Sequence, residues 1–176
     1  VADHLLGQGA EAVNATGTVL LQPGRNIEDI VMANLQYPGN RIASVQVSWL
    51  DPHKIRRITV VGSRKMAVFD DMASEGKLVI HDKGAEPPAQ DEGPDAAIRV
   101  RSGEIRLPAL TREEPLRREC SAFVEAVLTR RPPLADGRSG LQVVRALEAG
   151  AASLKRQGAA TRVEHNRFQL APETQT

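Results

Sequence analysis

The sequence predicts an α+β domain built on an open, mostly antiparallel β-sheet with helices packed on one face. Three observations predict this class. Apolar side chains recur at every second position between residues 11 and 107, which is typical of strands. After Pro108 they recur at intervals of about 3.6 residues, which is typical of helices. Short turn motifs rather than helices separate the strand segments, and such turns join antiparallel strands.

The length and composition allow one domain with a sizeable core. The chain has 176 residues and a mass of 19.1 kDa, and 41% of its residues are hydrophobic. The predicted single domain, residues 1–176, has four parts, which are a helix end at 1–8, the sheet at 11–107, two helices at 111–158 and a tail at 161–176. The opening helix already ends at Gly7, so we expect the chain to be a piece of a longer protein.

The strand segments combine alternating apolar positions with β-branched residues. The expected strands are residues 12–19, 29–37, 42–50, 55–62, 65–70, 77–81 and 162–164, with a more polar pair at 97–100 and 104–107. Gly39-Asn40 and Gly62-Ser63 predict tight antiparallel hairpins, and Ser102-Gly103 predicts the turn of the last pair. Residues 84–94 are rich in Pro, Gly and acidic residues and predict an exposed loop.

Two amphipathic helices are predicted after the sheet. Thr111 followed by Glu114 fits a capping box, which places the start of the first helix at Thr111. The apolar faces are Leu116, Cys120, Phe123, Val124, Val127 and Leu128 in the first helix, and Leu141, Val144, Leu147, Ala151 and Leu154 in the second. Both faces are expected to cover the sheet, with Cys120 in the core.

The charge pattern excludes several classes of partner. The 23 Lys and Arg and 22 Asp and Glu leave a net charge of +1 and are scattered along the chain, so no basic surface for nucleic acid is expected. No apolar stretch is long enough to span a membrane, and we expect no membrane partner. Cys120 is the single cysteine, which indicates a reducing compartment and predicts a cytoplasmic location.

No set of residues predicts a catalytic or metal centre in this chain. His4, His53, His81 and His165 lie far apart, and none has a second His or Cys at ligand spacing. Asp70 and Asp71 are adjacent in a strand, so their side chains would point to opposite faces and would not meet on one cation. The chain contains no G-x-G-x-x-G, no phosphate-binding G-x-x-x-x-G-K-[ST] and no G-x-S-x-G, and therefore carries no cofactor fingerprint.

One connection between strands gathers residues suited to an anionic ligand. Trp49 offers a flat apolar wall, Lys54 a mobile point charge, and Arg56 a forked donor for phosphate or carboxylate. These three are the candidate substrate-binding residues. The alternative is a buried tryptophan beside solvated surface charges.

The same segment opens a series of blocks that resembles a known family. The blocks are residues 48–56, 58–63, 65–71, 115–120 with Phe123, 131–133, Asp136-Gly137, Gly140-Leu141, Val143-Val144, and 147–149 with Ser153-Leu154. In order and spacing they resemble the C-terminal domain of Gfo/Idh/MocA oxidoreductases. Their nearest likeness is to the sugar-nucleotide branch, such as the UDP-N-acetylglucosaminuronate 3-dehydrogenases.

The resemblance implies a parent enzyme in which a Rossmann domain binds NAD or NADP and precedes a domain like this one. The second domain would shape the pocket for a sugar or nucleotide sugar and form a homo-oligomer through its sheet. The catalytic Lys of the E-K-P motif and the catalytic His would lie outside this sequence. In the family that His lies about ten residues before the glycine that Gly7 resembles, whereas His4 is only three residues before Gly7. No catalytic residue and no cofactor are therefore expected on this chain.

The sequence therefore predicts the substrate-binding and oligomerisation domain of an NAD(P)-dependent dehydrogenase of sugar hydroxyls, inert without its cofactor domain. The alternative is a sheet-and-helix module that dimerises or scaffolds without chemistry. Val45, Val47 and Trp49 against Leu50 and Ile58 predict a sheet covered on both faces, by helices on one side and a partner on the other. A G-x-G-x-x-G and an E-K-P in the upstream reading frame would favour the dehydrogenase.

Overall fold

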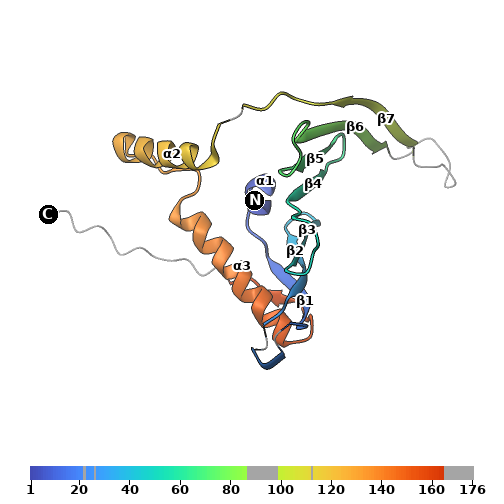
Figure 1. Cartoon of the computed structure of the whole chain (residues 1–176), viewed down its shortest axis with the longest axis vertical. Helices are drawn as coiled ribbons and strands as arrows, with labels where there is room; N and C mark the ends of the chain where they lie inside the picture. Colours follow the sequence, from blue (N-terminus) through green and yellow to red (C-terminus); the bar gives the residue numbers. More distant parts are fainter. Residues whose placement is uncertain (22, 26, 87–98, 112, 165–176) are drawn as a thin grey trace. The chain divides into compact units, whose positions relative to one another are not determined.

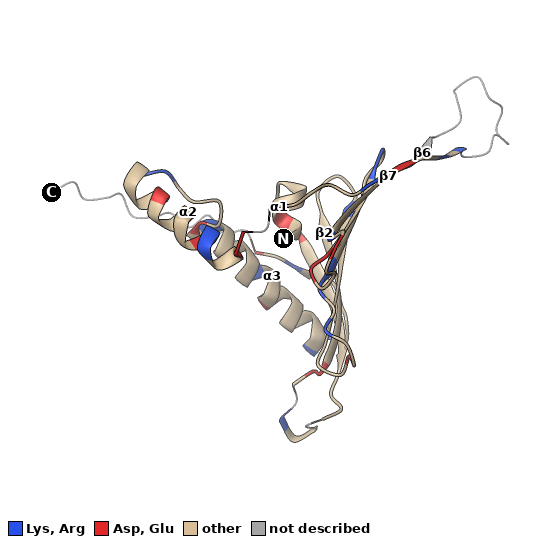
Figure 2. Ribbon diagram, turned by 45° about the horizontal axis from the view of Figure 1, so that its top comes forward, with Lys and Arg blue, Asp and Glu red and all other residues tan. Residues whose placement is uncertain are grey.

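The computed structural model describes the chain except residues 22, 26, 87–98, 112 and 165–176 (Figure 1). Two compact units are formed, one by Val1–Leu50 with Ser121–Thr176 and the other by Asp51–Cys120. Acidic and basic residues are interspersed along both, as Figure 2 shows. The elements are α1 (Ala2–Leu6), β1 (Ala12–Thr18), η1 (Pro23–Arg25), β2 (Ile30–Tyr37), β3 (Arg41–Ser48), β4 (Arg57–Val61), β5 (Met66–Asp70), β6 (Leu78–Glu86), β7 (Arg99–Arg106), α2 (Pro115–Thr129), α3 (Gly137–Lys155) and β8 (Thr161–Arg162).

The first unit contains a four-stranded antiparallel sheet in the order β3-β2-β1-β8. Strands β2 and β3 pair from Tyr37 with Arg41 to Ile30 with Ser48. Gly39 and Asn40 make the turn between them with φ angles of 74° and 57°. Gly and Asn accept this left-handed backbone more readily than other residues do, and the predicted hairpin is confirmed.

Helix α3 packs on one face of this sheet and closes the core. The buried apolar residues of the described chain are Ala10, Val13, Ala15, Tyr37, Ala149 and Val163. The helix turns its small residues to the strand, because these allow a close approach, and a Cβ on Gly150 would lie 3.7 Å from a methyl of Val13. The prediction that Val144 and Leu147 face the sheet is therefore wrong, and they are 50% and 67% exposed.

A fully buried serine joins α3 to β1. The Ser153 hydroxyl accepts a hydrogen bond from the Ala15 N–H at 2.9 Å and donates one to the Ala159 carbonyl at 2.8 Å. Strand β8 pairs only with Ala12 and Val13, so Ala15 lies beyond the end of that ladder. The hydroxyl of Ser153 thus takes the place of a strand partner for Ala15.

The second unit contains another four-stranded antiparallel sheet, in the order β4-β5-β6-β7. The Gly62 N–H donates to the Lys65 carbonyl at 3.0 Å and closes the predicted hairpin between β4 and β5. With α3 on one face of the first sheet and antiparallel pairing in both, the α+β class with an open antiparallel arrangement is confirmed.

Two predicted features of this second sheet are wrong. Residues 84–86 continue strand β6 instead of starting a loop, and the rest of that predicted loop lies outside the described residues. Strand β7 runs through Ser102 and Gly103 without a turn, because the long β6 pairs with both of its halves. A register shift opposite Asp82 absorbs the glycine, where an added Cβ would lie 2.5 Å from the Asp82 carboxylate.

Helix α2 starts later and is more exposed than the sequence predicts. It begins at Pro115 rather than Thr111, because proline suits the first helical position and disfavours helical backbone at Glu114. None of its described residues is buried, and its apolar face remains exposed, with Phe123 at 66% and Leu128 at 78%. The placement of Cys120 in the core is also wrong, since its side chain is exposed. Among the described helices, none is both long and apolar enough to cross a membrane.

The β2–β3 hairpin holds α1 by polar contacts. The buried Tyr37 donates its hydroxyl proton to Asp3 at 2.7 Å, and the Arg41 guanidinium donates to the Leu6 carbonyl at 3.1 Å. Burial first, and then the hydrogen bond to Asp3, raise the pKa of Tyr37 far above its ordinary value.

We expect ultraviolet titration of this chain to show no tyrosinate at pH values slightly above the ordinary pKa of about 10. Tyr37 is the only tyrosine, so the signal reports on it alone. Because the unfolded state loses this proton first, the stability that the protonated hydroxyl provides is complete below pH about 10 and falls as the pH rises beyond it. Tyrosinate should therefore form together with loss of the circular dichroism of the fold. Half-titration near the ordinary pKa with the circular dichroism unchanged would contradict this assignment.

Candidate functional site

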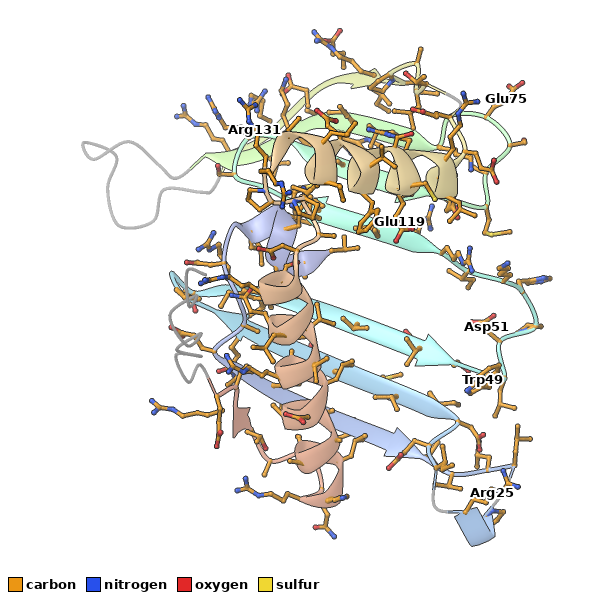
Figure 3. The ribbon with its side chains drawn as sticks, turned by 90° about the vertical axis from the view of Figure 1, so that its left-hand side faces the viewer. Arg25, Trp49, Asp51, Glu75, Glu119 and Arg131 are labelled. Atoms are coloured by element: carbon orange, nitrogen blue, oxygen red, sulfur yellow. The ribbon has the colours of Figure 1, made fainter. Side chains whose placement is uncertain are left out.

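Trp49 follows β3 directly and projects from the first unit (Figure 3). Trp49 is 84% exposed, so the alternative prediction of a buried tryptophan is wrong. The backbone beneath it is fixed, because the Trp49 N–H donates to the Asp29 carbonyl at 2.9 Å. A large aromatic side chain held in the open on an ordered backbone is suited to contact a ligand or a partner.

Asp29 organises the loop beside Trp49, a role that the sequence analysis missed. Its carboxylate accepts hydrogen bonds from the backbone N–H groups of Leu20 and Leu21, both at 2.8 Å. These two bonds lower the pKa of Asp29, the one from Leu21 more strongly. An Asp as the first residue of an expected strand is a weak signal, since only the fold brings residues 20 and 21 back to it.

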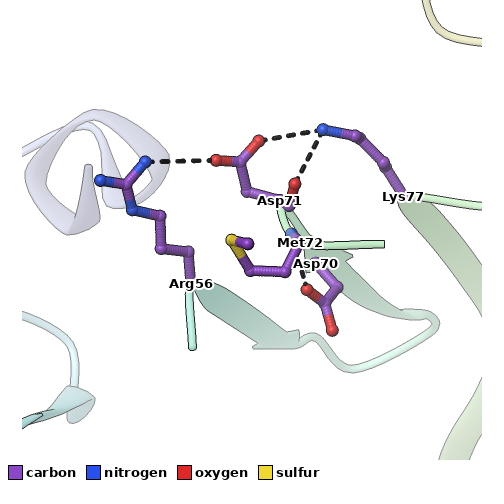
Figure 4. A network of polar contacts seen from close by, with 5 residues as sticks. All are labelled: Arg56, Asp70, Asp71, Met72 and Lys77. Atoms are coloured by element: carbon purple, nitrogen blue, oxygen red, sulfur yellow. Dashed lines mark hydrogen bonds and ion pairs between the residues drawn. The ribbon is translucent and has the colours of Figure 1, made fainter. Parts of the chain in front are cut away.

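Arg56 lies in a charge cluster of the second unit, shown in Figure 4. Its guanidinium stands 3.7 Å from one carboxylate oxygen of Asp71. The Lys77 ammonium stands 3.2 Å from the other oxygen and donates to the Asp71 carbonyl at 2.8 Å. Lys77, first through its hydrogen bond and then through its charge, and to a smaller extent Arg56, lower the pKa of Asp71. Asp71 is therefore an anion that holds two cations at the end of the β4–β5 hairpin.

Arg57 repeats this pairing with the neighbouring carboxylate. Its guanidinium is 3.9 Å from Asp70, and its side chain is 60% exposed, as is that of Arg56. Asp70 and Asp71 thus face different cations, as expected for adjacent residues at a strand end. No group of three potential metal ligands occurs among the described residues.

The structure gives one predicted site residue, Arg56, a partner that the sequence did not predict. Arg56 pairs with Asp71, which also pairs with Lys77, whereas Lys54 is exposed and has no ion pair with a described residue. Trp49 belongs to the other unit, so a pocket shared by Trp49, Lys54 and Arg56 stays a prediction.

The histidines that the structure describes show no convergence. His4 and His53 are exposed in α1 and in the β3–β4 connection, and His81 is half-buried in β6. His165 lies outside the described residues. These positions offer no assembled general base to a ligand near Arg56 or Trp49.

A protein-family model and several solved structures are similar to this chain. The family model described as the GFO/IDH/MocA C-terminal domain matches residues 1–68. The chain superimposes on an aldose-aldose oxidoreductase from Caulobacter crescentus, complexed with glycerol, with a TM-score of 0.66 and 22% identity over 92% of this chain and 43% of that one. No curated protein matches this sequence.

Two further solved structures share this fold. A UDP-N-acetylglucosamine 3-dehydrogenase from Acidithiobacillus ferrooxidans gives a TM-score of 0.66 and 18% identity over 87% of this chain and 43% of that one. A levoglucosan dehydrogenase in complex with NADH and levoglucosan gives a TM-score of 0.65 and 17% identity over 92% of this chain and 47% of that one. This chain thus spans less than half the length of these three structures. The predicted resemblance to the C-terminal domain of Gfo/Idh/MocA oxidoreductases is confirmed, by the family match over residues 1–68 and by the fold of the described chain.

Proposed function

We propose that residues 1–176 form the substrate-binding and oligomerisation domain of an NAD(P)-dependent oxidoreductase that acts on a hydroxyl of a sugar or nucleotide sugar. The observation that carries this proposal is the family match, which spans the segment containing Trp49, Lys54 and Arg56. The solved structures support it, because those named are an aldose oxidoreductase, a UDP-N-acetylglucosamine dehydrogenase and a levoglucosan dehydrogenase. With Cys120 as the single, unpaired cysteine, we propose a cytoplasmic location.

In the described chain, the connection between β7 and α2 does not fit a dinucleotide. A dinucleotide pyrophosphate binds where a strand passes through a glycine-rich turn into a helix. Here β7 is followed by residues 107–114, which contain no glycine, before α2 begins. NAD or NADP would therefore be held by another part of the parent protein, and this chain alone would be inert.

In this proposal the chain contributes substrate binding. Trp49 would cover the apolar face of a sugar ring or base, while Arg56 and Lys54 would hold an anionic group. The pair of Arg56 with Asp71 is long and solvent-exposed, so it holds the guanidinium weakly and leaves it available to a ligand. No side chain described here is assigned to proton or hydride transfer.

The test is cofactor reduction by the protein expressed from the complete gene, beside the 176-residue chain. Each is incubated with NAD+ or NADP+ and a panel of free sugars and UDP-sugars, and NAD(P)H absorbance is recorded. We expect turnover of at least one sugar by the complete protein and none by the 176-residue chain. No turnover across the panel by a folded complete protein would overturn the proposal in favour of the non-catalytic dimerisation module.

For oligomerisation we propose the second sheet as the interface. In the first sheet, Val45 and Val47 pair with Ala33 and Val31 and so share the face that α3 covers in part. The opposite face of that sheet is mostly polar, with Asn34, Gln36, Ser44 and Gln46. The second sheet instead carries apolar residues on both faces. Val61, Met66 and Ile105 lie in one row with His81, and Val60, Ala67 and Ile80 lie in the next row with Arg106.

Size-exclusion chromatography with light scattering should give a defined dimer or tetramer for this chain. Val61→Glu places a charge within the proposed interface and should reduce the mass to that of a monomer. Ile42→Glu is the control, because Ile42 is equally exposed at 70% but lies on the polar face of the first sheet. A monomeric parent chain, or the same mass for Val61→Glu and the parent, would rule out this interface.

A further inference from the structure

A second cluster of cations lies at the other end of β4 from Arg56. The β4–β5 turn, residues 62–65, forms one wall of a hollow of about 740 Å³ with Asp82 of β6 and Arg101 of β7. Since β4 and its flanks separate Arg56 from this turn, the two clusters are roughly 20 Å apart at the rise of an extended strand. The hollow is therefore separate from the candidate substrate residues.

The turn is fixed in position by contacts beneath it. The Arg101 guanidinium donates to the Arg64 carbonyl at 2.7 Å and to the Asp82 carboxylate at 2.7 Å. Gly84 of β6 is buried against the turn, and a Cβ there would lie 2.7 Å from the Ser63 carbonyl oxygen. Arg101 and Gly84 thus place the turn against the strands below it.

Several donors of the turn, apart from the Gly62 N–H, have no partner in the described chain. Within the described chain, the backbone N–H groups of Ser63 and Arg64 and the Ser63 hydroxyl make no hydrogen bond. The exposed side chains of Arg64 and Lys65 likewise have no ion pair with a described residue. Successive free N–H groups in a turn, together with a hydroxyl and cations, are the donors that bind phosphate oxygens.

The described residues that line the hollow carry an excess of two positive charges. Arg64, Lys65 and Arg101 line it with one anion, Asp82. The hydrogen bond from Arg101 and the charges of Arg101, Lys65 and Arg106 lower the pKa of Asp82, so their fields converge here. A phosphate group carries about −1.5 to −2 charges at neutral pH, which matches this excess.

We propose that this hollow binds the phosphate group of a small phosphorylated ligand. Arg64 and Lys65 would pair with the phosphate, and the Ser63 N–H and hydroxyl would donate to its oxygens. Arg101 is a positioning residue, since Asp82 and the Arg64 carbonyl already occupy its guanidinium. This proposal does not depend on the oxidoreductase assignment.

The test is a titration of the isotope-labelled 176-residue chain with inorganic pyrophosphate, followed by amide NMR at constant ionic strength. We expect saturable shifts centred on the amides of Ser63, Arg64 and Lys65. Arg64→Ala and Lys65→Ala should each weaken binding about tenfold, the loss of one charge-assisted hydrogen bond. Both side chains are exposed on a turn, so the variants should fold. Arg57→Ala removes the same charge at the far end of β4 and should leave the affinity unchanged.

Orthophosphate and UDP are titrated in the same way to identify the source of the phosphate. Tighter binding of orthophosphate would indicate a monoester, and tighter binding of pyrophosphate and UDP a diphosphate. Shifts that fail to saturate, or equal weakening in Arg57→Ala, would overturn the proposal by showing only general attraction of anions. Binding of UDP without binding of either inorganic anion would also overturn it, because recognition would then rest on the nucleoside.

Discussion

Replacing Ser153 with alanine should lower the free energy of unfolding of the chain by about 2 kcal/mol. Ser153 is fully buried, and its hydroxyl is the partner of the Ala15 N–H and the Ala159 carbonyl. The alanine variant leaves both backbone groups without this hydrogen bond, and water has little access to a site packed between α3 and β1. The better helix propensity of alanine offsets roughly 0.5 kcal/mol of the loss at most.

Urea denaturation followed by circular dichroism measures this effect. The midpoint should fall while the slope of the free energy against urea stays the same, because the fold buries the same surface. Ser121→Ala is the matched control, since Ser121 is an exposed serine of α2. An unchanged midpoint for Ser153→Ala would mean that another group supports the end of β1.

Replacing Arg56 with alanine should raise the KM of the complete enzyme for its sugar substrate about tenfold or more, with a smaller change in kcat. The variant removes a forked cation that would pair with the substrate anion, and one such charge-assisted hydrogen bond contributes roughly 1.5–3 kcal/mol. Stability should hardly change, since the pair with Asp71 is exposed and Lys77 remains on that carboxylate.

Arg57→Ala is the control for Arg56→Ala. Both arginine side chains are 60% exposed, and each pairs with one of two neighbouring aspartates, Asp71 and Asp70. Arg56 directly precedes β4, and Arg57 is the first residue of β4. Loss of general positive charge would raise KM equally in the two variants, whereas a specific contact raises it only in Arg56→Ala. An unchanged KM and kcat in Arg56→Ala would remove Arg56 from the pocket.

Local patterns predicted most of the strands and both hairpins in the described chain. Gly39-Asn40 and Gly62-Ser63 fixed the turns, and alternating apolar residues fixed the strands between them. The errors arose where a segment far away in the sequence determines the local conformation or the buried face. Ser102-Gly103 has the composition of a turn, yet pairing with the long β6 keeps β7 extended through it. In α3 the apolar period favoured Leu147, but the closeness of β1 selects the smaller Ala149 and Ser153.

The candidate site residues were chosen by residue type, and their partners in the structure could not be predicted from the sequence. Trp49 and Arg56 were identified because their chemistry suits a ligand, and the exposure of Trp49 agrees with such a role. The partners of Arg56 could not be found in the same way, because only the β4–β5 ladder brings Asp71 back to Arg56. Asp29 and the free donors of the β4–β5 turn likewise depend on how the backbone folds.

Substrate binding by this domain requires that the exposed Trp49 face the substrate, and the KM of Trp49→Ala in the complete protein tests this most directly. Met32→Ala is the control, because Met32 is 54% exposed and lies on the face of the first sheet opposite to α3. The sugar is first identified by cofactor reduction. We then predict a KM at least about tenfold higher for Trp49→Ala, because the variant loses the aromatic contact that bound substrate would bury, and an unchanged KM for Met32→Ala. Equal KM values for the parent and Trp49→Ala would contradict the claim and leave Trp49 to an interface between subunits.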